Sequence, residues 1–477
     1  MSSDTAKKKR SLPRVARWAI LLLVGVVIAL IPCPDGLDQK AWYCFAIFVA
    51  TIVGFMIQAA PMGVLSIVAL ALVAILNLAP VTTVLSSFGS TTAWIILCAF
   101  FLARGIKKTG LGRRIALILI RLLGRSTLSV AYSLTFAETI MGAAMPSIMA
   151  RSGGVMYPIA SGVCDVYDSK PGPSGKKIGN YLVQMEGQVA CIVSAMFMTA
   201  MASNPLVVEL ALSTANLSLS WTQWMLAALV PGLLSLILIP LVLYKIEKPT
   251  IRKTPKAREM AAQQLEEMGP MGFHEKVQLI VFVGCLALWG TSNLHGINAT
   301  VVAIVGVAVL LITGVLTWDD CLSEKNGWDS FIWIAALMQM ANLITDGGIL
   351  NYFAEWISPY VGNMPWLLAL IVICLLYLYS EYFFASMTSH ITALYGPFLL
   401  VCIAAGAPPM MAALVLAMMS NVCGGITNYA GGHMPVWFGA GYVDQGTWWR
   451  NGFICSLINV ATFLGIGSLW WNVIGLY

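Results

Sequence analysis

The stretch AMPSIMARSGG, residues 144–154, places an arginine among serines, glycines and a proline in an otherwise apolar part of the sequence. An ionised arginine at membrane depth is costly, so it usually has a partner or a function. Arg151 could offset the negative charge of an anionic solute, and Ser147 could donate a hydrogen bond to it. Three alternatives need no ligand: an ion pair with Glu138, an ion pair with Glu186, or a position at the cytoplasmic end of a helix.

Three other interrupted stretches carry polar side chains: MASNPLVVE (201–209), ASMTSHITA (385–393) and GGITNYAGGHMP (424–435). Irregular backbone cannot face lipid, and it is tolerated only where protein or a water-filled cavity surrounds it. Helix N-termini at such breaks point N–H groups and positive dipole ends into the cavity, which suits carboxylates. The predicted substrate-binding residues are Ser147, Arg151, Ser203, Asn204, Pro205, Ser386, Thr388, His390, Thr427, Asn428 and His433.

Charge in this set comes from Arg151 and His390, and the serines, threonines and asparagines offer neutral hydrogen bonds. Taken singly, each Ser or Thr is better explained by hydrogen bonding between helices. The prediction therefore depends on the whole set of interruptions and not on one residue.

The composition defines the class of protein that must position these residues. Of 477 residues, 59% are hydrophobic and only 10% are charged, whereas soluble domains are about 25% charged. This predicts an all-α polytopic membrane protein. The net charge of +6 lies in loops, so it indicates topology rather than nucleic-acid binding. The eleven cysteines form no CxxC pair and are interpreted as small core residues.

The beginning of the chain has the charge order of a signal peptide but lacks its cleavage site. Residues 7–10 read Lys-Lys-Lys-Arg, and an apolar run follows from Trp18 to Ile31. No A-x-A sequence comes after it, so we expect a retained first helix. The basic residues place the N-terminus in the cytoplasm.

Apolar segments of spanning length predict about eleven transmembrane helices. They are residues 18–32, 41–59, 62–79, 92–106, 181–201, 222–244, 276–293, 298–316, 330–345, 409–427 and 452–470. Two further stretches, about 127–160 and 365–404, are broken by Pro, Gly, Ser and charged residues. The first is too short for two spans and is flanked by basic loops that both favour the cytoplasm. We therefore predict re-entrant hairpins there.

The two halves of the sequence match each other. Gly110 aligns with Gly348, Ser147 with Ser386, and Arg151 with His390; Pro158 likewise aligns with Pro397. Chance similarity in apolar sequence is the alternative. Five spans in each repeat require opposite orientations, and inverted repeats with broken helices are typical of secondary transporters. The predicted division is 1–40 (cytoplasmic N-terminus and first helix), 41–244 (first repeat), 245–274 (cytoplasmic linker) and 275–477 (second repeat).

Several other classes of protein are disfavoured. The sequence has no HExxH motif and no Cys/His metal spacing, and it has no GxxxxGK[ST] phosphate loop. An intramembrane enzyme would need paired acids, for which Glu138 and Glu186 are the sole candidates. An anion channel is disfavoured by the duplicated hairpins. We predict no catalytic residues and no cofactor.

Four stretches of the sequence resemble the divalent anion:sodium symporter family, and in particular its citrate/succinate, tartrate/succinate and 2-oxoglutarate/malate antiporter branch. The stretches are PSIMARSGG, YFFASMTSHITALYGP, SNPLVVELA and GGITNYAGGHMPVWFGAGYVDQGTWWRNGF. The resemblance implies eleven spans, two re-entrant hairpins, and a homodimer whose transport domain moves as an elevator against a scaffold. It also implies di- or tricarboxylate substrates.

The sequence departs from this family at the hairpin tips. The family usually has Ser-Asn-Thr at the first tip, where this chain has Ser147, Ile148 and Met149; the second tip has Ser386, Met387 and Thr388. Sodium needs oxygen ligands, so the sodium sites near these six residues are predicted to be degenerate. The family's THYGTGPAP also reads TNYAGGHMP here (427–435), which indicates a changed substrate contact.

Together these observations predict a carboxylate antiporter in a bacterial inner (plasma) membrane. Its partners would be small carboxylates, the lipid bilayer and a second copy of the chain, with no nucleic acid. The alternative is a sodium- or proton-coupled dicarboxylate symporter. An anion channel or an intramembrane enzyme is the remote alternative.

Overall fold

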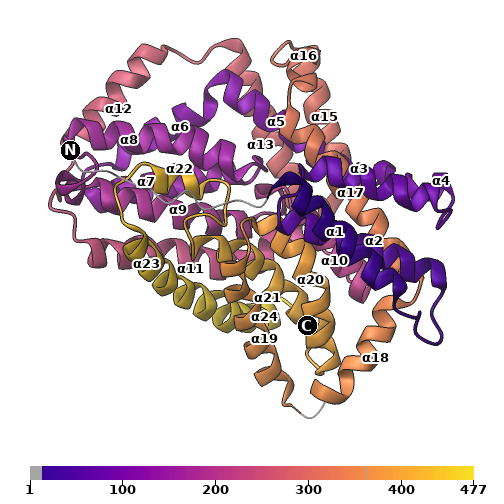
Figure 1. The fold of residues 1–477 in the computed structure, drawn as a ribbon. Helices are drawn as coiled ribbons and strands as arrows, with labels where there is room; N and C mark the ends of the chain where they lie inside the picture. The colour runs from indigo at the N-terminus through magenta and orange to yellow at the C-terminus, as the bar shows by residue number, and fades with distance from the viewer. Residues whose placement is uncertain (1–12, 362–363) are drawn as a thin grey trace.

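A computed structural model describes residues 13–361 and 364–477, and its elements are helices (Figure 1). The sole β-type pairing among these residues is an isolated bridge between Ser126 and Lys253. The predicted all-α fold is therefore confirmed. The basic cluster at residues 7–10, on which the predicted N-terminal orientation depends, lies outside the described residues.

Among the described residues, the first half of the chain contains twelve α-helices. They are α1 (Arg14–Leu30), α2 (Gln39–Met56), α3 (Met62–Ile75), α4 (Val81–Val84), α5 (Thr91–Thr109), α6 (Leu111–Leu123), α7 (Thr127–Gly142), α8 (Tyr157–Val166), α9 (Gly179–Met196), α10 (Asn204–Ala215), α11 (Trp221–Glu247) and α12 (Pro255–Met268). A π-helical segment, η2 (Met149–Met156), leads directly into α8.

The second half contains another twelve. They are α13 (Phe273–Gly290), α14 (Ser292–His295), α15 (Ala299–Ile312), α16 (Trp318–Leu322), α17 (Lys325–Asp346), α18 (Ile349–Val361), α19 (Trp366–Ser380), α20 (Met387–Ala404), α21 (Pro409–Val422), α22 (Met434–Gly439), α23 (Gln445–Asn459) and α24 (Gly467–Val473). The π-helical segment η7 (Val460–Ile466) joins α23 to α24.

Six helical stretches in the described part of the chain are long and apolar enough to cross a membrane, and the bent pair α17–α18 makes a seventh. The six are α2, α11, α13, α19 with the short helix after it, α20, and α23 through α24. Helices α3, α15 and α21 are apolar but shorter. The sequence predicts more spans than this because α1, α3, α15 and α21 are continuous but short, and α5 is long enough but carries Arg104, Lys107 and Lys108 near its end.

The order of elements repeats between the halves, as the sequence alignment predicts. Helix α5 ends at Gly110 (φ 76°) before α6, and α17 is followed by Gly348 (φ 78°) before α18. In each half two interrupted helices follow: α7 to α8 and α9 to α10 in the first, α19 to α20 and α21 to α22 in the second. A left-handed glycine at the same place in both halves supports the alignment, because few other residues adopt that backbone conformation.

The helices pack in two groups. Figure 1 shows α6–α9 and α11 bundled on one side and α2–α4 with α15–α17 on the other. In the first group α9 packs on α7 and α11, and it also contacts α21. Helix α5 packs on α15 and α17 of the second group. Contacts between α10 and α17 and between α2 and α20 join the groups.

Ion pairs hold the loop around α16 beside the end of α5. Lys108 Nζ donates to Asp320 Oδ2 at 2.6 Å, and Arg104 lies 3.8 Å from Glu324. The hydrogen bond from Lys108 lowers the pKa of the Asp320 carboxyl to about 2. Both loops therefore lie at the same end of the bundle, as the positive-inside assignment requires.

The polar stretch predicted as a linker, 245–274, contains a docked helix. Helix α12 packs on α6, where Arg258 Nε donates to the Arg121 carbonyl at 2.8 Å. Just after the end of α12, the Gly269 carbonyl accepts a hydrogen bond from Arg114 of α6 at 2.9 Å. Arg114 also forms an ion pair with Glu275. The connection between the halves is thus fixed to the first half by side chain–backbone bonds.

Gly110→Ala tests the left-handed junction between α5 and α6. A Cβ there meets only the end of Met268 at 3.6 Å, so the cost comes from the backbone and is about 1 kcal/mol. We expect a lower thermal unfolding midpoint in detergent. The control is Gly284→Ala within α13, where a Cβ meets nothing within 4 Å and alanine favours helix. Equal midpoints for both variants would contradict the assignment.

Candidate functional site: the meeting point of four interruptions

Four breaks in the helices converge in the structure. We call them tip 1 (143–148, between α7 and η2), break 1 (197–203, between α9 and α10), tip 2 (381–386, between α19 and α20) and break 2 (423–433, between α21 and α22). The main chain at each is irregular or forms only short 3₁₀ turns. Their polar backbone groups must find partners in one another.

Hydrogen bonds join tip 1 to both breaks. Arg151 Nη1 donates to the Ala200 carbonyl of break 1 at 2.9 Å. Trp437, on the short helix α22 after break 2, donates through Nε1 to Ser152 Oγ at 2.8 Å. Ser147 Oγ accepts the Ala150 N–H at 3.2 Å and so caps the helix that starts at tip 1.

Tip 2 is joined to the same two breaks. The Met387 N–H donates to the Ala430 carbonyl at 3.1 Å, and Thr388 Oγ1 lies 3.4 Å from Ser203 Oγ. The two interrupted helices are themselves bridged, since Asn421 Nδ2 donates to Asn204 Oδ1 at 2.9 Å. The structure therefore brings the four interruptions together.

Arg151 is completely buried and its guanidinium is bound on three nitrogens. Nε donates to Glu138 Oε1 at 2.7 Å in an ion pair, Nη1 also donates to the Met145 carbonyl at 2.7 Å, and Nη2 donates to Ser194 Oγ at 3.2 Å. The ion pair expected as an alternative to substrate binding is present, and its acid is Glu138. The charge of Arg151 is matched locally, and the side chain fixes tip 1.

Glu186, the other candidate partner, lies on α9 and is also fully buried. Neither of its carboxyl oxygens has a hydrogen-bond partner among the described residues.

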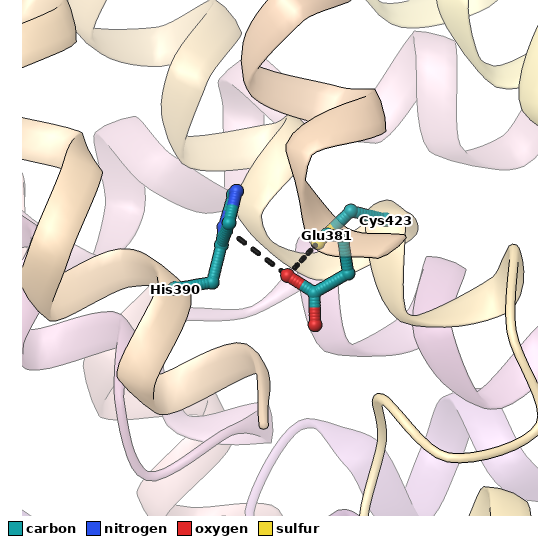
Figure 2. A group of neighbouring side chains, drawn as sticks. All are labelled: Glu381, His390 and Cys423. Atoms are coloured by element: carbon teal, nitrogen blue, oxygen red, sulfur yellow. Dashed lines mark hydrogen bonds and ion pairs between the residues drawn. The ribbon is translucent and has the colours of Figure 1, made fainter. Parts of the chain in front are cut away.

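His390 holds tip 2 through a buried group that sequence reasoning missed (Figure 2). Its Nδ1 lies 3.3 Å from Glu381 Oε2, and Cys423 Sγ lies 3.6 Å from the same oxygen. On the other side of the ring, Nε2 lies 2.9 Å from the Tyr377 carbonyl and 2.8 Å from Ser380 Oγ. The group connects both arms of the second hairpin to break 2.

Glu381, His390 and Cys423 are also the donor types that zinc sites use. Their ligand atoms all lie within 4.8 Å of one another, so among the described residues they are the set best suited to a metal. Their separation along the chain matches no metal-binding motif, so spacing alone could not have identified them. The buried acid Glu381 beside predicted His390 was the sole available hint.

The two tips have a similar arrangement of a basic residue and an acid. The acid of the second tip, Glu381, lies one helical turn later in the alignment than Glu138 does in the first. Arg151 reaches back 13 residues to Glu138, and His390 reaches back 13 residues to the carbonyl of Tyr377. Glu381 occupies the position that aligns with Gly142, and a Cβ at Gly142 would lie 3.7 Å from the Arg151 guanidinium. Glu138 lies on α7 and Glu381 at the start of tip 2, so each basic residue lies near an acid that precedes it in its own hairpin.

The predicted residues separate by burial. Ser147, Ser386, Thr388 and Asn428 are half-buried, whereas the remaining seven are fully buried: Arg151, Ser203, Asn204, Pro205, His390, Thr427 and His433. The half-buried four can touch a solute directly in this conformation. The side chains of the buried seven are not accessible in this conformation.

Three of the buried residues hold the breaks in shape. Asn204 Nδ2 donates to the Ser194 carbonyl at 2.8 Å, and Thr427 Oγ1 accepts the Ala430 N–H at 3.0 Å. His433 Nε2 lies 3.1 Å from the Gly187 carbonyl. Gln188, which the sequence analysis did not single out, donates to the Gly425 carbonyl at 2.6 Å; its signal is a polar side chain on the fully buried helix α9.

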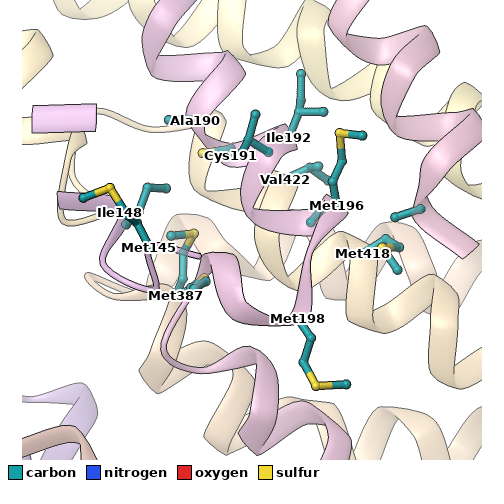
Figure 3. Packing of buried hydrophobic residues seen from close by; sticks show 14 of the residues in the cluster. Met145, Ile148, Ala190, Cys191, Ile192, Met196, Met198, Met387, Met418 and Val422 are labelled. Carbon is teal, nitrogen blue, oxygen red and sulfur yellow. The ribbon is translucent and has the colours of Figure 1, made fainter. Parts of the chain in front are cut away.

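Apolar side chains fill the region where the family would place sodium ligands. Ile148 and Met387 are 7% and 3% exposed and belong to the same buried apolar cluster as Met145 and Cys191 (Figure 3). The Met387 sulfur lies over Gly424 so closely that a Cβ there would overlap it. Met149 is instead 53% exposed. Alkyl and thioether groups are poor ligands for a hard cation, which prefers oxygen.

The chain has extensive similarity to known proteins. A family model described as sodium:sulfate symporter transmembrane region matches residues 12–477. A Bacillus subtilis (strain 168) protein named "Putative malate transporter YflS" is 45% identical over 478 residues, covering 100% of both chains. Dicarboxylate transporter 1, chloroplastic, of Spinacia oleracea is 41% identical over 459 residues, covering 96% of this chain and 81% of the relative.

The fold is also similar to a solved structure. The Alcanivorax borkumensis YdaH transporter superposes with a TM-score of 0.56, covering 97% of this chain and 98% of that one. The two sequences are 14% identical, so this likeness concerns the fold alone.

Removing one partner of the Arg151–Glu138 pair should destabilise the protein strongly. Arg151→Met or Glu138→Leu leaves a buried charge unmatched, which costs about 3–5 kcal/mol. The double variant should recover much of this loss. Unfolding midpoints in detergent check the prediction, with Asp165→Asn in the exposed Lys170–Asp165 pair expected to change nothing measurable. Additive losses in the double variant would show that the pair is not coupled.

Proposed function

Since the chain belongs to the divalent anion:sodium symporter family, we propose that it exchanges di- or tricarboxylates across a bacterial inner membrane. Substrates of the succinate, malate, 2-oxoglutarate, tartrate or citrate type fit the proposal. Two relatives carry the names of a malate and a dicarboxylate transporter. The chain is a multi-pass membrane transporter and not an enzyme.

The observation that carries the proposal is the convergence of two hairpin tips on two helix breaks. Helices α10 and α20, and the helix formed by η2 and α8, all begin at this point. The first N–H groups of a helix have no carbonyl partner within it, and its N-terminus carries partial positive charge. A carboxylate bound there would be met by these N–H groups and by the half-buried Ser147, Ser386, Thr388 and Asn428.

In this proposal Arg151 and His390 do not contact the substrate but hold the two tips that do. Arg151 keeps tip 1 in shape through the Ala200 carbonyl and Glu138, and His390 does the same for tip 2 through Glu381. Direct contact of either side chain with substrate would require the tip to open. The affinity for a dianion then comes mainly from neutral donors and helix ends.

The packing of Ile148 and Met387 favours exchange over sodium-driven uptake. A sodium ion at either tip would need oxygen ligands where these side chains lie. An antiporter needs no driving ion, because the concentration gradient of the outgoing carboxylate drives the uptake of the incoming one. An elevator motion of a transport domain against a scaffold, within a homodimer in the bilayer and with a cytoplasmic N-terminus, completes the proposal.

A proton-coupled symporter is the second candidate. Both carboxyl oxygens of Glu186 and Oε1 of Glu381 are buried without hydrogen-bond partners among the described residues. A carboxyl of this kind could carry one proton with each cycle. Such coupling would make uptake depend on a pH gradient even when no counter-substrate is present.

Counterflow in proteoliposomes tests the function. Vesicles loaded with unlabelled malate or succinate should take up labelled dicarboxylate at least tenfold faster than empty vesicles. Replacing sodium by choline should leave the initial rate within twofold. Uptake into empty vesicles that requires sodium, or that follows an imposed pH gradient, would replace antiport by the corresponding symport.

Thr388→Val tests the site itself, because it removes a hydroxyl and keeps the shape of the side chain. A hydrogen bond to a charged group contributes about 1.5–3 kcal/mol, so the KM for dicarboxylate should rise roughly tenfold or more. Thr313→Val is the matched control, since Thr313 lies at the end of α15 and its hydroxyl bonds to the Val309 carbonyl of its own helix. An unchanged KM for Thr388→Val would remove this residue from the site.

A further inference from the structure

Three fully buried side chains at tip 2 and break 2 direct ligand atoms of different types toward one another (Figure 2). Glu381 offers a carboxylate oxygen, His390 a ring nitrogen and Cys423 a thiol sulfur. Among the described residues, no other group of three His, Cys, Asp or Glu side chains brings its ligand atoms this close together. The proposed carboxylate transport uses His390 to hold tip 2, but it gives the thiol of Cys423 no role.

The distances within this group agree with tetrahedral coordination of a zinc ion. Zinc lies about 2.0 Å from oxygen or nitrogen ligands and about 2.3 Å from sulfur, which places an oxygen about 3.3 Å from a nitrogen and about 3.5 Å from a sulfur in one tetrahedron. In the structure, Glu381 Oε2 lies 3.3 Å from His390 Nδ1 and 3.6 Å from Cys423 Sγ. Three corners of a coordination tetrahedron are therefore available, and the fourth would be taken by a small ligand such as water.

The surroundings of the imidazole leave its Nδ1 free to act as a ligand. Nε2 of His390 lies 2.9 Å from the Tyr377 carbonyl, and a carbonyl can only accept a hydrogen bond. Nε2 therefore carries the proton of the neutral ring, and Nδ1 carries a lone pair. Nδ1 has no hydrogen-bond partner among the described residues, although Glu381 is close. Histidines that bind metals almost always donate their other N–H to a carbonyl or carboxylate in this way.

The charges of the three ligands match a divalent cation. Binding requires deprotonated ligands, so the proton of the Cys423 thiol is released when the metal binds. One carboxylate, one thiolate and a neutral imidazole then carry two negative charges, which Zn²⁺ cancels in this apolar interior. Sodium and magnesium prefer oxygen ligands throughout, whereas thiolate and imidazole together suit zinc. The donor set therefore selects a zinc-type cation.

We propose that Glu381, His390 and Cys423 bind a zinc-type divalent cation that ties the second hairpin to break 2. Glu381 lies at the start of tip 2, His390 on the second arm of the hairpin, and Cys423 at the start of break 2. One ion thus links three segments that are far apart along the chain. Movement of tip 2 against break 2 requires the ion to lose a ligand. The ion should therefore slow carboxylate exchange, and this effect, unlike metal binding itself, rests on the proposed function.

Cobalt substitution tests the site without requiring transport. Co²⁺ replaces Zn²⁺ in tetrahedral sites, and a thiolate bound to it gives a charge-transfer absorption in the near ultraviolet. The full chain is produced in zinc-depleted, cobalt-supplemented medium, so that the ion is present while the buried site folds, and it is purified through a histidine-free tag. We expect about one cobalt ion per chain by mass spectrometry, together with the thiolate absorption.

Variants assign the ligands. Cys423→Ser should abolish the thiolate absorption, and Glu381→Gln should keep the thiol but lower the affinity for cobalt about tenfold or more. Cys402→Ser is the matched control, because Cys402 is also a fully buried thiol of α20 but lies about 18 Å along the helix from His390. It should leave the absorption and the cobalt content unchanged. Gel-filtration elution and circular dichroism check that each variant folds.

Counterflow in proteoliposomes tests the effect of the ion on transport. Protein loaded with zinc during expression should exchange dicarboxylate about fivefold more slowly, or slower still, than protein produced in zinc-depleted medium, because the ion favours one position of tip 2. Cys423→Ser should exchange at the same rate from either medium. Cys402→Ser should behave as the parent chain does.

The outcomes separate the metal site from the proposed function. Absence of the thiolate absorption, or an absorption that is unchanged in Cys423→Ser, overturns the metal site. Cobalt bound as expected, with equal exchange rates for zinc-loaded and zinc-depleted protein, overturns the restraint on tip 2. A chain that binds cobalt through Cys423 but exchanges no dicarboxylate in either form overturns the transport proposal and leaves the metal site established.

Discussion

Unpaired backbone groups cannot be left facing lipid, and the structure around the site depends on this constraint. Four interruptions release N–H and C=O groups in the middle of an apolar protein. They are satisfied by one another and by a few buried side chains, such as Gln188 at Gly425 and Arg151 at Ala200. None of the four could be kept irregular alone. The site is therefore a mutual arrangement, and its duplication in the sequence is a structural requirement as well as a sign of ancestry.

Buried charge follows the same logic. Each hairpin carries one basic residue after its tip and one acid before it, and each pair is completed within its own hairpin. Because the pairs are internally matched, the tips can lie beside an anion without adding a bare positive charge to the apolar interior. This leaves recognition to neutral hydroxyls, an amide and helix ends.

The all-helical membrane architecture could be predicted from the sequence, because apolar composition and interruptions of apolar segments are easily recognised. The all-α fold and the matched junctions at Gly110 and Gly348 follow from residue type and spacing. Other features depend on three-dimensional contact. Glu138 and Glu186 were both acceptable partners for Arg151 along the chain, and only packing selects Glu138. Cys423 joins Glu381 across 42 residues, with no spacing rule to reveal it. The number of spans was also harder to read, since an apolar segment does not show how much of it forms one continuous helix; α3 and α15, for example, have only 14 residues each.

The separation of partners along the chain has a consequence for synthesis at the ribosome. The Arg151–Glu138 pair spans 13 residues, so the first hairpin can neutralise its own charge soon after it emerges. The bond from Asn421 to Asn204 spans 217 residues, and the ion pair of Arg114 with Glu275 spans 161. The first half must therefore wait in the membrane with Asn204 and Arg114 incompletely satisfied until the second half is made. A nascent chain halted after α11 should be bound by insertion chaperones, and release from them should coincide with the appearance of α21.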